Sequence, residues 1–430
     1  MKILSIIHRY HPAVGGAESY MGTINKMLVG RGHQVTVLTT DAADFELFWN
    51  RSAKRFTHLK DSDHGVEIVR FPVRHLPFPK YAFPATRLAT AQISKIAPNS
   101  RLADWMTTLT PFVPAMRRWL ESTSDRFDAV LGTTITLEGI LKLGQQFAHK
   151  QNIPFIVFPL VHLGGGSAPG TEPISRFYTL PQQQQLVLAA DGLVAINPAE
   201  QAFYMVQGMA EEKTTLAPPA LVVADLVGGD RDRWRKRFNI HPETPVVCTV
   251  SALAKDKGAI QTVEALRHLW RAGHRICLAM AGTPMADFRA YLADIPADEK
   301  EQLLMLGKVS NQDRNDLLAA ADIFCMPSVV ESFGLAFAEA MFFKKPVIGG
   351  NVWGVKGFVI RPGENGFLVD SADVTGLAER IEQLVNDPRL AQKLGAAGYE
   401  FVTHELSWKK SIDQIERLLH KLTGLKGDVL

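Results

Sequence analysis

The chain has few cysteines and no pattern among them. Of its 430 residues only Cys248, Cys277 and Cys325 are cysteine, and no two of them form a C-x-x-C pair. This spacing shows neither a disulfide framework nor a cysteine zinc site. The composition fits a reducing compartment, so we expect the protein in the cytoplasm.

Long apolar runs are also absent. The apolar part of the N-terminal stretch MKILSIIHRYHP is too short for a signal peptide, and no small-residue cleavage site follows it. No run approaches the roughly 18 apolar residues that a membrane span needs. We expect neither secretion nor a transmembrane helix, while contact with the inner face of the cell membrane stays open.

Neither sign of charge dominates the composition. Lys and Arg number 47 against 44 Asp and Glu, which gives a net charge of +3. This excess is too small for a general nucleic-acid binder, although it lies in the first half of the chain, where it can produce a modest surface field. We therefore expect no nucleic-acid partner.

Short β-branched runs alternate with segments of helical periodicity, which is typical of parallel sheets covered by helices on both faces. The alternation begins with ILSII at 3–7 and restarts with PVVCTVS at 245–251. The pattern predicts an α/β fold of two doubly wound, Rossmann-like parallel-sheet domains, 1–218 and 219–400. A C-terminal helix within 401–430 is expected to cross back to the first domain.

The same periodicities predict the individual elements. Further strands are expected at 34–39, 66–71, 128–132, 153–160, 193–196, 275–280, 304–306, 323–326 and 346–348. Helices are expected at 17–30, 137–149, 182–190, 258–271, 313–320, 335–343 and 400–423.

The first candidate site is the pair Gly15 and Gly16, between the first predicted strand and helix. Glycines there let the backbone approach a ligand, and the N–H groups at the helix N-terminus suit a phosphate. The pattern is not G-x-G-x-x-G, so the dinucleotide fingerprint is missing. A tight strand-to-helix turn without a ligand is the alternative.

The second candidate site is the run ESFGLAFAE, from Glu331 to Glu339, after the predicted strand 323–326. Open α/β sheets bind ligands at the carboxyl ends of strands, and carboxylates there accept hydrogen bonds from sugar or ribose hydroxyls. Alternatively, Glu331 is an acid favoured by a helix N-terminus. Glu339 lies within an apolar helix face, where a buried carboxylate needs partners.

Two single residues complete the set. Lys257, in the run KDKG after the first strand of the second half, would add positive charge to a phosphate site, although a turn lysine can also be merely solvated. His162, ahead of three glycines, would donate or accept a hydrogen bond or serve as a structural histidine. The spacing of His162 with His8 and His11 makes no recognisable metal site.

Together these motifs resemble the family 4 glycosyltransferases of the GT-B type. The resembling stretches are HPAVGGAESYMGTINKMLVGRGHQVTVLTT, KGAIQTVEALRHL, LGKVSNQDRNDLLAAADIFCMPSVVESFGLAFAEAM and RPGENGFLVD. They cover essentially the whole chain and are weakest at 42–126. The resemblance implies an acceptor-side domain and a nucleotide-sugar-binding domain that face each other across a cleft.

The resemblance also implies an activity: transfer of a sugar, with retention, from a nucleotide-diphosphate sugar to a glycan, lipid-linked or small-molecule acceptor. No metal or other cofactor is expected. Since no carboxylate stands out as a covalent nucleophile, we expect a front-face mechanism in which the leaving phosphate helps to deprotonate the acceptor.

The residue roles follow from the same resemblance. Gly16 offers its N–H to the donor phosphates, Lys257 neutralises the diphosphate leaving group, and His162 lies against the donor sugar. Glu331 holds sugar hydroxyls and Glu339 the ribose. The catalytic candidates are His162, Lys257 and Glu331; the donor-binding candidates are Gly15, Gly16, Lys257, Glu331, Ser332, Phe333, Gly334, Leu335 and Glu339.

Two positions depart from the family's pattern. Ala252 stands where the family usually has an arginine five residues before the lysine, and Gly357 stands near a usual glutamate. Loss of a bidentate phosphate-binding arginine should cost a few kcal/mol of leaving-group stabilisation unless Lys255 or Lys356 replaces it. A catalytically weak homologue that binds a nucleotide or a partner is therefore the alternative function.

The segment 72–126 does not fit the strand and helix alternation, because it contains seven prolines and several aromatic residues. One interpretation is a lipid-headgroup surface that reaches a lipid-linked acceptor. The other is an insertion whose aromatic residues pack beneath it, since prolines interrupt any regular amphipathic helix. The side chains concerned are Trp105, Phe112, Arg117, Arg118 and Trp119.

Overall fold

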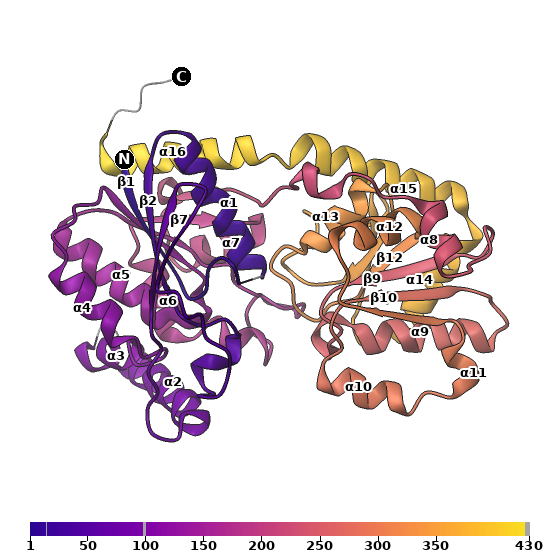
Figure 1. Ribbon diagram of the computed structural model, residues 1–430, viewed down its shortest axis with the longest axis horizontal. Helices are drawn as coiled ribbons and strands as arrows, with labels where there is room; N and C mark the ends of the chain where they lie inside the picture. The colour runs from indigo at the N-terminus through magenta and orange to yellow at the C-terminus, as the bar shows by residue number, and fades with distance from the viewer. Residues whose placement is uncertain (14, 98–99, 426–430) are drawn as a thin grey trace. The chain divides into compact units, whose positions relative to one another are not determined.

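The structure is a computed structural model that describes residues 1–13, 15–97 and 100–425. Residues 426–430 of the predicted C-terminal segment lie outside this range. The chain divides into two compact units (Figure 1). Unit 1 comprises Met1–Val161, Arg176–Ala217 and the chain from Lys409 onward; unit 2 comprises His162–Ser175 and Pro218–Trp408.

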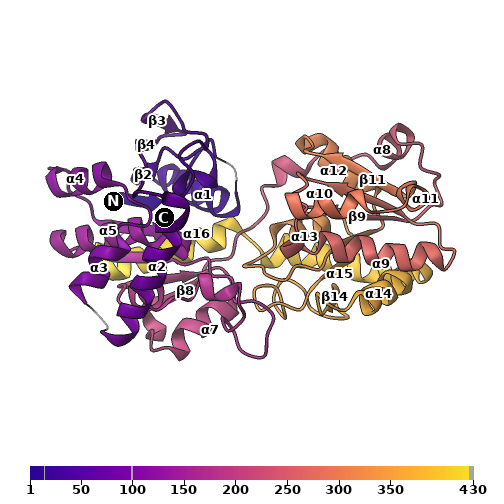
Figure 2. The ribbon, with the colours of Figure 1, turned by 90° about the horizontal axis from the view of Figure 1, so that it is seen from below.

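Unit 1 is built on an eight-stranded sheet in the order β3-β4-β2-β1-β5-β6-β7-β8. Its strands are β1 (Lys2–Ile7), β2 (Gln34–Thr40), β3 (Lys60–Asp63), β4 (Val66–Phe71), β5 (Ala129–Thr133), β6 (Phe155–Phe158), β7 (Gly192–Ala195) and β8 (Thr214–Leu216). Only β3 is antiparallel to its neighbour among these strands. Figure 2 shows β3 and β8 at opposite edges.

Helices cover this sheet, and their buried side chains contribute to the hydrophobic core of unit 1. They are α1 (Gly16–Gly30), α2 (Pro79–Ile96), α3 (Arg101–Thr107), α4 (Pro114–Ser122), α5 (Glu138–Gln151), α6 (Pro181–Leu188), α7 (Pro198–Val206) and α16 (Trp408–Thr423). Every residue of β1 from Ile3 to Ile7 is buried, as a central parallel strand covered on both faces requires.

Unit 2 contains a six-stranded parallel sheet in the order β11-β10-β9-β12-β13-β14. Its strands are β9 (Val246–Val250), β10 (Cys277–Ala281), β11 (Leu303–Gly307), β12 (Ile323–Met326), β13 (Val347–Gly350) and β14 (Gly366–Val369). Its helices are α8 (Arg231–Arg237), α9 (Ala259–Arg271), α10 (Ala286–Ala293), α11 (Ala297–Lys300), α12 (Asn311–Ala320), α13 (Leu335–Phe342), α14 (Val374–Asn386) and α15 (Pro388–Glu400).

The doubly wound α/β fold predicted from the sequence is confirmed in both units. Each predicted strand, and each predicted helix before position 400, is present to within two residues at either end. In unit 1 the strand β1 lies between β2 and β5, and in unit 2 the strand β9 lies between β10 and β12. Strand order reverses at these points, and open α/β sheets form their ligand crevices there.

The single helix predicted over 400–423 is wrong. The chain leaves α15 through a π-helical turn, Phe401–Glu405, and Leu406 then adopts an extended conformation before α16 begins. Arg361 fixes this turn, because its guanidinium pairs with Glu405 and lies 4.7 Å from the centre of the Phe401 ring. These tertiary contacts interrupt an amphipathic pattern that continues in the sequence.

Candidate functional site

An ion pair joins the loops that follow β9 and β12 in unit 2. Lys257 follows β9 and Glu331 follows β12, and the Lys257 ammonium donates to Glu331 Oε1 over 2.6 Å. The Ser328 hydroxyl donates to the same oxygen over 3.3 Å. The structure therefore brings together two of the residues that the sequence singles out, 74 positions apart.

Backbone contacts hold the loops around this ion pair close together. The N–H of Val329 donates to the carbonyl of Asp256 over 2.9 Å, which joins the loop after β12 to the loop after β9. Gly258 has a φ of +74°, and a Cβ there would overlap the Pro327 carbonyl. A Cβ on Gly354, in the loop after β13, would overlap the Glu331 carbonyl. Glycine is needed at both positions for the loops to approach so closely.

His162 belongs to unit 2 and is affected by the charge of Lys257. Burial, joined by the positive charge of Lys257, lowers the pKa of His162 to about 3. The imidazole is therefore neutral at pH 7. In this state it donates and accepts hydrogen bonds but carries no charge.

Trp353, which the sequence analysis does not identify, anchors the glycine run after His162. Its backbone N–H donates to the Gly164 carbonyl over 2.7 Å, and its indole N–H donates to the Gly166 carbonyl over 3.0 Å. The Gly165 N–H donates to the Glu172 carboxylate over 3.1 Å. These bonds fix the loop that begins at His162.

A cavity of about 320 Å³ opens in this part of unit 2. Its lining mixes backbone, amide and acidic groups, which gives it both hydrogen-bond donors and acceptors. The lining residues are Gly165, Gly166, Glu172, Gln261, Val329, Asn351, Val352, Asp370, Ser371 and Ala372.

Glu339 has a different cationic partner from Glu331. It lies on α13, and its Oε1 is 3.2 Å from Nη1 of Arg314 on α12. Burial raises the pKa of Glu339, Arg314 opposes this effect, and Asp225 adds to it. Arg314 is a second residue that the sequence analysis misses.

The N-terminus of α13 carries the remaining candidates of unit 2. Gly334 caps the helix with a φ of +77°, and a Cβ there would lie 2.5 Å from the Phe337 ring. Phe333 is buried against the ring of Phe358, with 6.2 Å between ring centres. Ser332 and Leu335 are partly exposed. The first N–H groups of a helix have no intrahelical acceptor, so this end offers donors to a ligand.

Gly15 and Gly16 lie in unit 1, where Gly16 is the first residue of α1. A Cβ on Gly16 would meet no atom within 4 Å. Nearby, the buried carboxylate of Glu18 pairs with Arg9 over 2.6 Å. Burial lowers the pKa of His8, which lies 3.7 Å from Glu18, to about 4.

The two departures from the family's pattern lie on the surface. Ala252 and Gly357 are exposed, and Gly357 has a φ of +73°. Lys255 and Lys356, the possible replacements for an arginine, are exposed as well. The ammonium of Lys356 lies 5.8 Å from the centre of the Trp353 ring.

Residues 1–13, 15–97 and 100–425 contain neither a cluster of metal-binding side chains nor a helix that could cross a membrane. No group of three or more His, Cys, Asp or Glu side chains there could hold a metal ion. Every helix in the same ranges falls short of the length and apolarity that crossing a bilayer requires.

Known structures share this fold over nearly the whole chain. The sucrose-phosphate synthase of Thermosynechococcus elongatus is 19% identical, with a TM-score of 0.70 over 98% of this chain and 99% of its own. The Anabaena protein HepE in complex with UDP is 17% identical, with a TM-score of 0.69 over 98% of this chain and 100% of its own.

Two family models match successive parts of the sequence. One, described as a glycosyl transferase 4-like domain, matches residues 15–220, and the other, described as glycosyl transferases group 1, matches residues 230–401. The chain belongs to the family 4 glycosyltransferases of the GT-B type. The family predicted from the sequence motifs is thereby confirmed.

Curated relatives match this glycosyltransferase over part of their length. A GDP-mannose-dependent monoacylated alpha-(1-6)-phosphatidylinositol monomannoside mannosyltransferase of Corynebacterium glutamicum is 29% identical over 197 residues, 44% of this chain and 51% of its own. The alpha-maltose-1-phosphate synthase of Mycobacterium tuberculosis is 28% identical over 264 residues, 56% of this chain and 65% of its own. The chain thus spans about half to two thirds of these relatives.

Proposed function

We propose that the protein transfers a sugar, with retention, from a nucleotide-diphosphate sugar to a glycan, lipid-linked or small-molecule acceptor. The Lys257–Glu331 pair carries this proposal, because it puts a cation and a carboxylate together at the carboxyl edge of the unit 2 sheet, where open α/β sheets bind ligands. The C. glutamicum relative, which is GDP-mannose-dependent, supports a nucleotide-sugar donor.

Lys257 would neutralise the diphosphate as it leaves, while Glu331 accepts hydrogen bonds from the donor sugar. Fixed charges and dipoles that stabilise a developing negative charge make the largest contribution to the rate enhancement of many enzymes. The two side chains contact each other, so donor binding would exchange this ion pair for contacts with phosphate and sugar. A neutral His162 suits a hydrogen bond to a sugar hydroxyl.

The remaining candidates would hold the rest of the donor. Glu339 would bind the ribose, and the N-terminus of α13, from Ser332 to Leu335, would direct N–H groups toward the sugar and phosphates. Gly16 would offer its N–H to phosphate. The open space beside Gly16 supports this role, because packing within unit 1 does not require a glycine there.

Thermal denaturation with UDP, GDP, ADP and their sugar conjugates, with and without EDTA, tests the proposal. A ligand that binds only the native state raises its stability. We expect the nucleotide with one particular base to raise the melting temperature even when EDTA is present. The sugar conjugate of that nucleotide is then the donor for a transfer assay. No shift with any nucleotide would overturn the proposed function.

A catalytically weak protein that binds a nucleotide or a partner is the second candidate function. The exposed Ala252 and Gly357 favour it, because the family's usual arginine and glutamate are missing there. The variant Ala252→Arg separates the two functions. A large gain in turnover would indicate a decayed site, whereas unchanged turnover in an active enzyme would indicate a site that works with different residues.

Membrane contact is a further part of the proposal, with a set of residues that keeps Trp105 and Arg118 from those first considered. Phe112 and Trp119 are half-buried, whereas α2 and α3 expose apolar side chains together with the basic Lys95 and Arg101. Arg118, on α4, is exposed as well. Apolar and basic groups together suit an anionic lipid surface. The exposed apolar residues are Tyr81, Leu88, Ile96, Leu102 and Trp105.

A further inference from the structure

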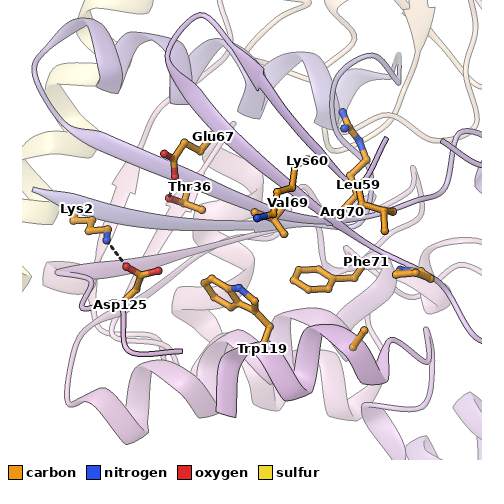
Figure 3. A pocket seen from close by; sticks show the side chains of 12 residues that line it. Lys2, Thr36, Leu59, Lys60, Glu67, Val69, Arg70, Phe71, Trp119 and Asp125 are labelled. Carbon is orange, nitrogen blue, oxygen red and sulfur yellow. Dashed lines mark hydrogen bonds and ion pairs between the residues drawn. The ribbon is translucent and has the colours of Figure 1, made fainter. Parts of the chain in front are cut away.

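Unit 1 contains a larger cavity, of about 620 Å³, between its sheet and helix α4 (Figure 3). This volume lies in the range of pockets that bind small molecules. The residues that line it come from the first four strands and the residues next to β3 and β4, from α4, and from the loop after α4. They are Lys2, Thr36, Leu59, Lys60, Glu67, Val69, Arg70, Phe71, Pro72, Ala115, Trp119 and Asp125.

Two aromatic rings form one wall of this cavity. Trp119 projects from α4 toward the strands, as Figure 3 shows, and its ring lies edge-on to Phe71 with 6.3 Å between ring centres. Trp119 is half-buried, and its indole N–H makes no hydrogen bond to any of the residues that the structure describes. A partly buried indole N–H ordinarily has a partner, so this wall offers an apolar surface with a donor available to a ligand.

Polar groups of both signs surround the aromatic wall. The carboxylate of Glu67 accepts a hydrogen bond from the Thr36 hydroxyl over 3.2 Å. Lys60 is exposed and forms no ion pair with the described residues. The ion pair between Lys2 and Asp125, at 2.8 Å, closes one end of the cavity in Figure 3.

The charges of the lining nearly cancel. Lys2 is paired with Asp125, and Arg70 is paired with Asp61 at 3.2 Å and donates to the His58 carbonyl. The remaining cation, Lys60, is matched by the carboxylate of Glu67. Such a field favours neither a phosphate nor a cationic ligand. It suits a neutral molecule whose hydroxyl groups donate and accept hydrogen bonds and whose C–H groups pack on aromatic rings.

We propose that this cavity binds a short neutral oligosaccharide, as a holding site for a glycan acceptor. Lys2 begins β1 and Asp125 precedes β5, so the cavity reaches the amino ends of these strands, whereas Gly15 and Gly16 follow the carboxyl end of β1. At its other end the cavity reaches Phe71, the last residue of β4, and Arg70 there donates to the His11 carbonyl. Gly15 and Gly16 are not among the residues that line it. A second point of attachment raises the effective concentration of a long acceptor. The acceptor role rests on the proposed function; saccharide binding itself does not.

Binding is tested by NMR of the indole N–H signals of the full-length protein, with maltotriose, cellotriose and mannotriose as probes. We expect a saturable shift of the Trp119 signal with at least one probe. Glu67→Gln, which keeps the shape of the side chain, and Trp119→Phe, which keeps a ring, should each weaken binding, Trp119→Phe roughly tenfold. Binding to the Trp119→Phe variant is measured by calorimetry. The variant Trp105→Phe, at an exposed position on α3, is the matched control and should leave binding unchanged.

The outcomes separate this inference from the proposed function. No shift of the Trp119 signal with any probe, or equal loss of binding in Trp119→Phe and Trp105→Phe, overturns the holding site. The melting temperatures of all variants show whether a loss of saccharide binding reflects unfolding. If Trp119→Phe is unfolded, saccharide binding by Glu67→Gln decides whether the holding site exists. Nucleotide binding in the same samples tests the donor site. Saccharide binding without nucleotide binding would overturn the proposed function but would still establish the ligand of the cavity.

Discussion

The ammonium group of Lys257 lies 2.6 Å from Oε1 of Glu331, and their side chains are only 24% and 8% exposed. This ion pair is partly shielded from water, so each charged group needs the other as its partner. A ligand that takes the place of either partner must supply the lost charge or hydrogen bond. Diphosphate and sugar hydroxyls, which carry these groups together, meet that requirement.

Replacement of Lys257 by alanine should abolish transfer, with a rate loss of at least roughly 100-fold, because the leaving diphosphate loses its cation. It should also lower the free energy of unfolding by about 1–3 kcal/mol, since the Glu331 carboxylate loses a charged partner. Kinetics and thermal denaturation measure the two effects. Lys393→Ala, at an exposed position on α15, should change neither. Full activity of Lys257→Ala would contradict the assigned role.

The same lysine should control the titration of His162. Its charge adds to burial in holding the pKa of His162 near 3. We expect Lys257→Met to raise the pKa of His162 toward its ordinary value, because a repelling charge is removed while burial persists. NMR titration of the imidazole measures it. An unchanged pKa in the variant would mean that burial alone accounts for the shift.

Acid should destabilise the protein through this histidine. The unfolded chain binds a proton at His162 near pH 6.5, whereas the folded protein does so only near pH 3. Stability contributed by the neutral imidazole is therefore present above pH 6.5 and lost as the pH falls toward 3. Between pH 7 and pH 5 the free energy of unfolding should fall less in His162→Gln than in the original protein. The difference corresponds to the uptake of about one proton by the unfolded chain at this position. The exposed His58→Gln serves as the control, and equal losses in both variants would contradict this prediction.

Gly16→Ala should separate ligand binding from folding. A Cβ there meets no atom within 4 Å, so the melting temperature should not fall. If the Gly16 N–H binds phosphate, the added methyl group should weaken donor binding about tenfold by obstructing close approach. Gly22→Ala, on the same helix and also with room for a Cβ, should leave donor binding unchanged. Equal donor affinity in both variants would exclude Gly16 from the site. Calorimetric titration with the donor measures the difference.

The sequence predicts the central strands well because each is a short buried run followed by a helix with one apolar face. Strands β3, β8 and β14 are not predicted. The sequence of β3 is KDSD, four residues that are mostly exposed at the edge of the sheet, so neither composition nor alternation marks it. Its pairing with β4 depends on the neighbouring strand rather than on its own residues.

The candidate site can likewise be predicted from the sequence only in part. Lys257 and Glu331 each follow a predicted strand, so their place at the carboxyl edge can be anticipated from the sequence. The partner of Glu339 cannot, because Arg314 lies 25 residues earlier on another helix and meets it only through packing. Trp353 likewise donates a hydrogen bond to Gly166, which lies 187 residues away. Such contacts leave no periodic or local signal.

The exposed face of α2 and α3 predicts the behaviour of the protein on lipid vesicles. Leu88 and Ile96 follow Tyr81 by seven and fifteen residues, which places all three on one face of α2, and they are 58%, 85% and 73% exposed in that order. We expect co-sedimentation with anionic vesicles, weakened at least several-fold by Leu88→Asp with Ile96→Asp and by raised salt. Val206→Asp, on an 89% exposed residue of α7, is the control. Because all three substituted residues are exposed, the melting temperatures of the variants should agree within a few degrees. Binding that is indifferent to these changes and to the anionic lipid would exclude this surface from membrane contact.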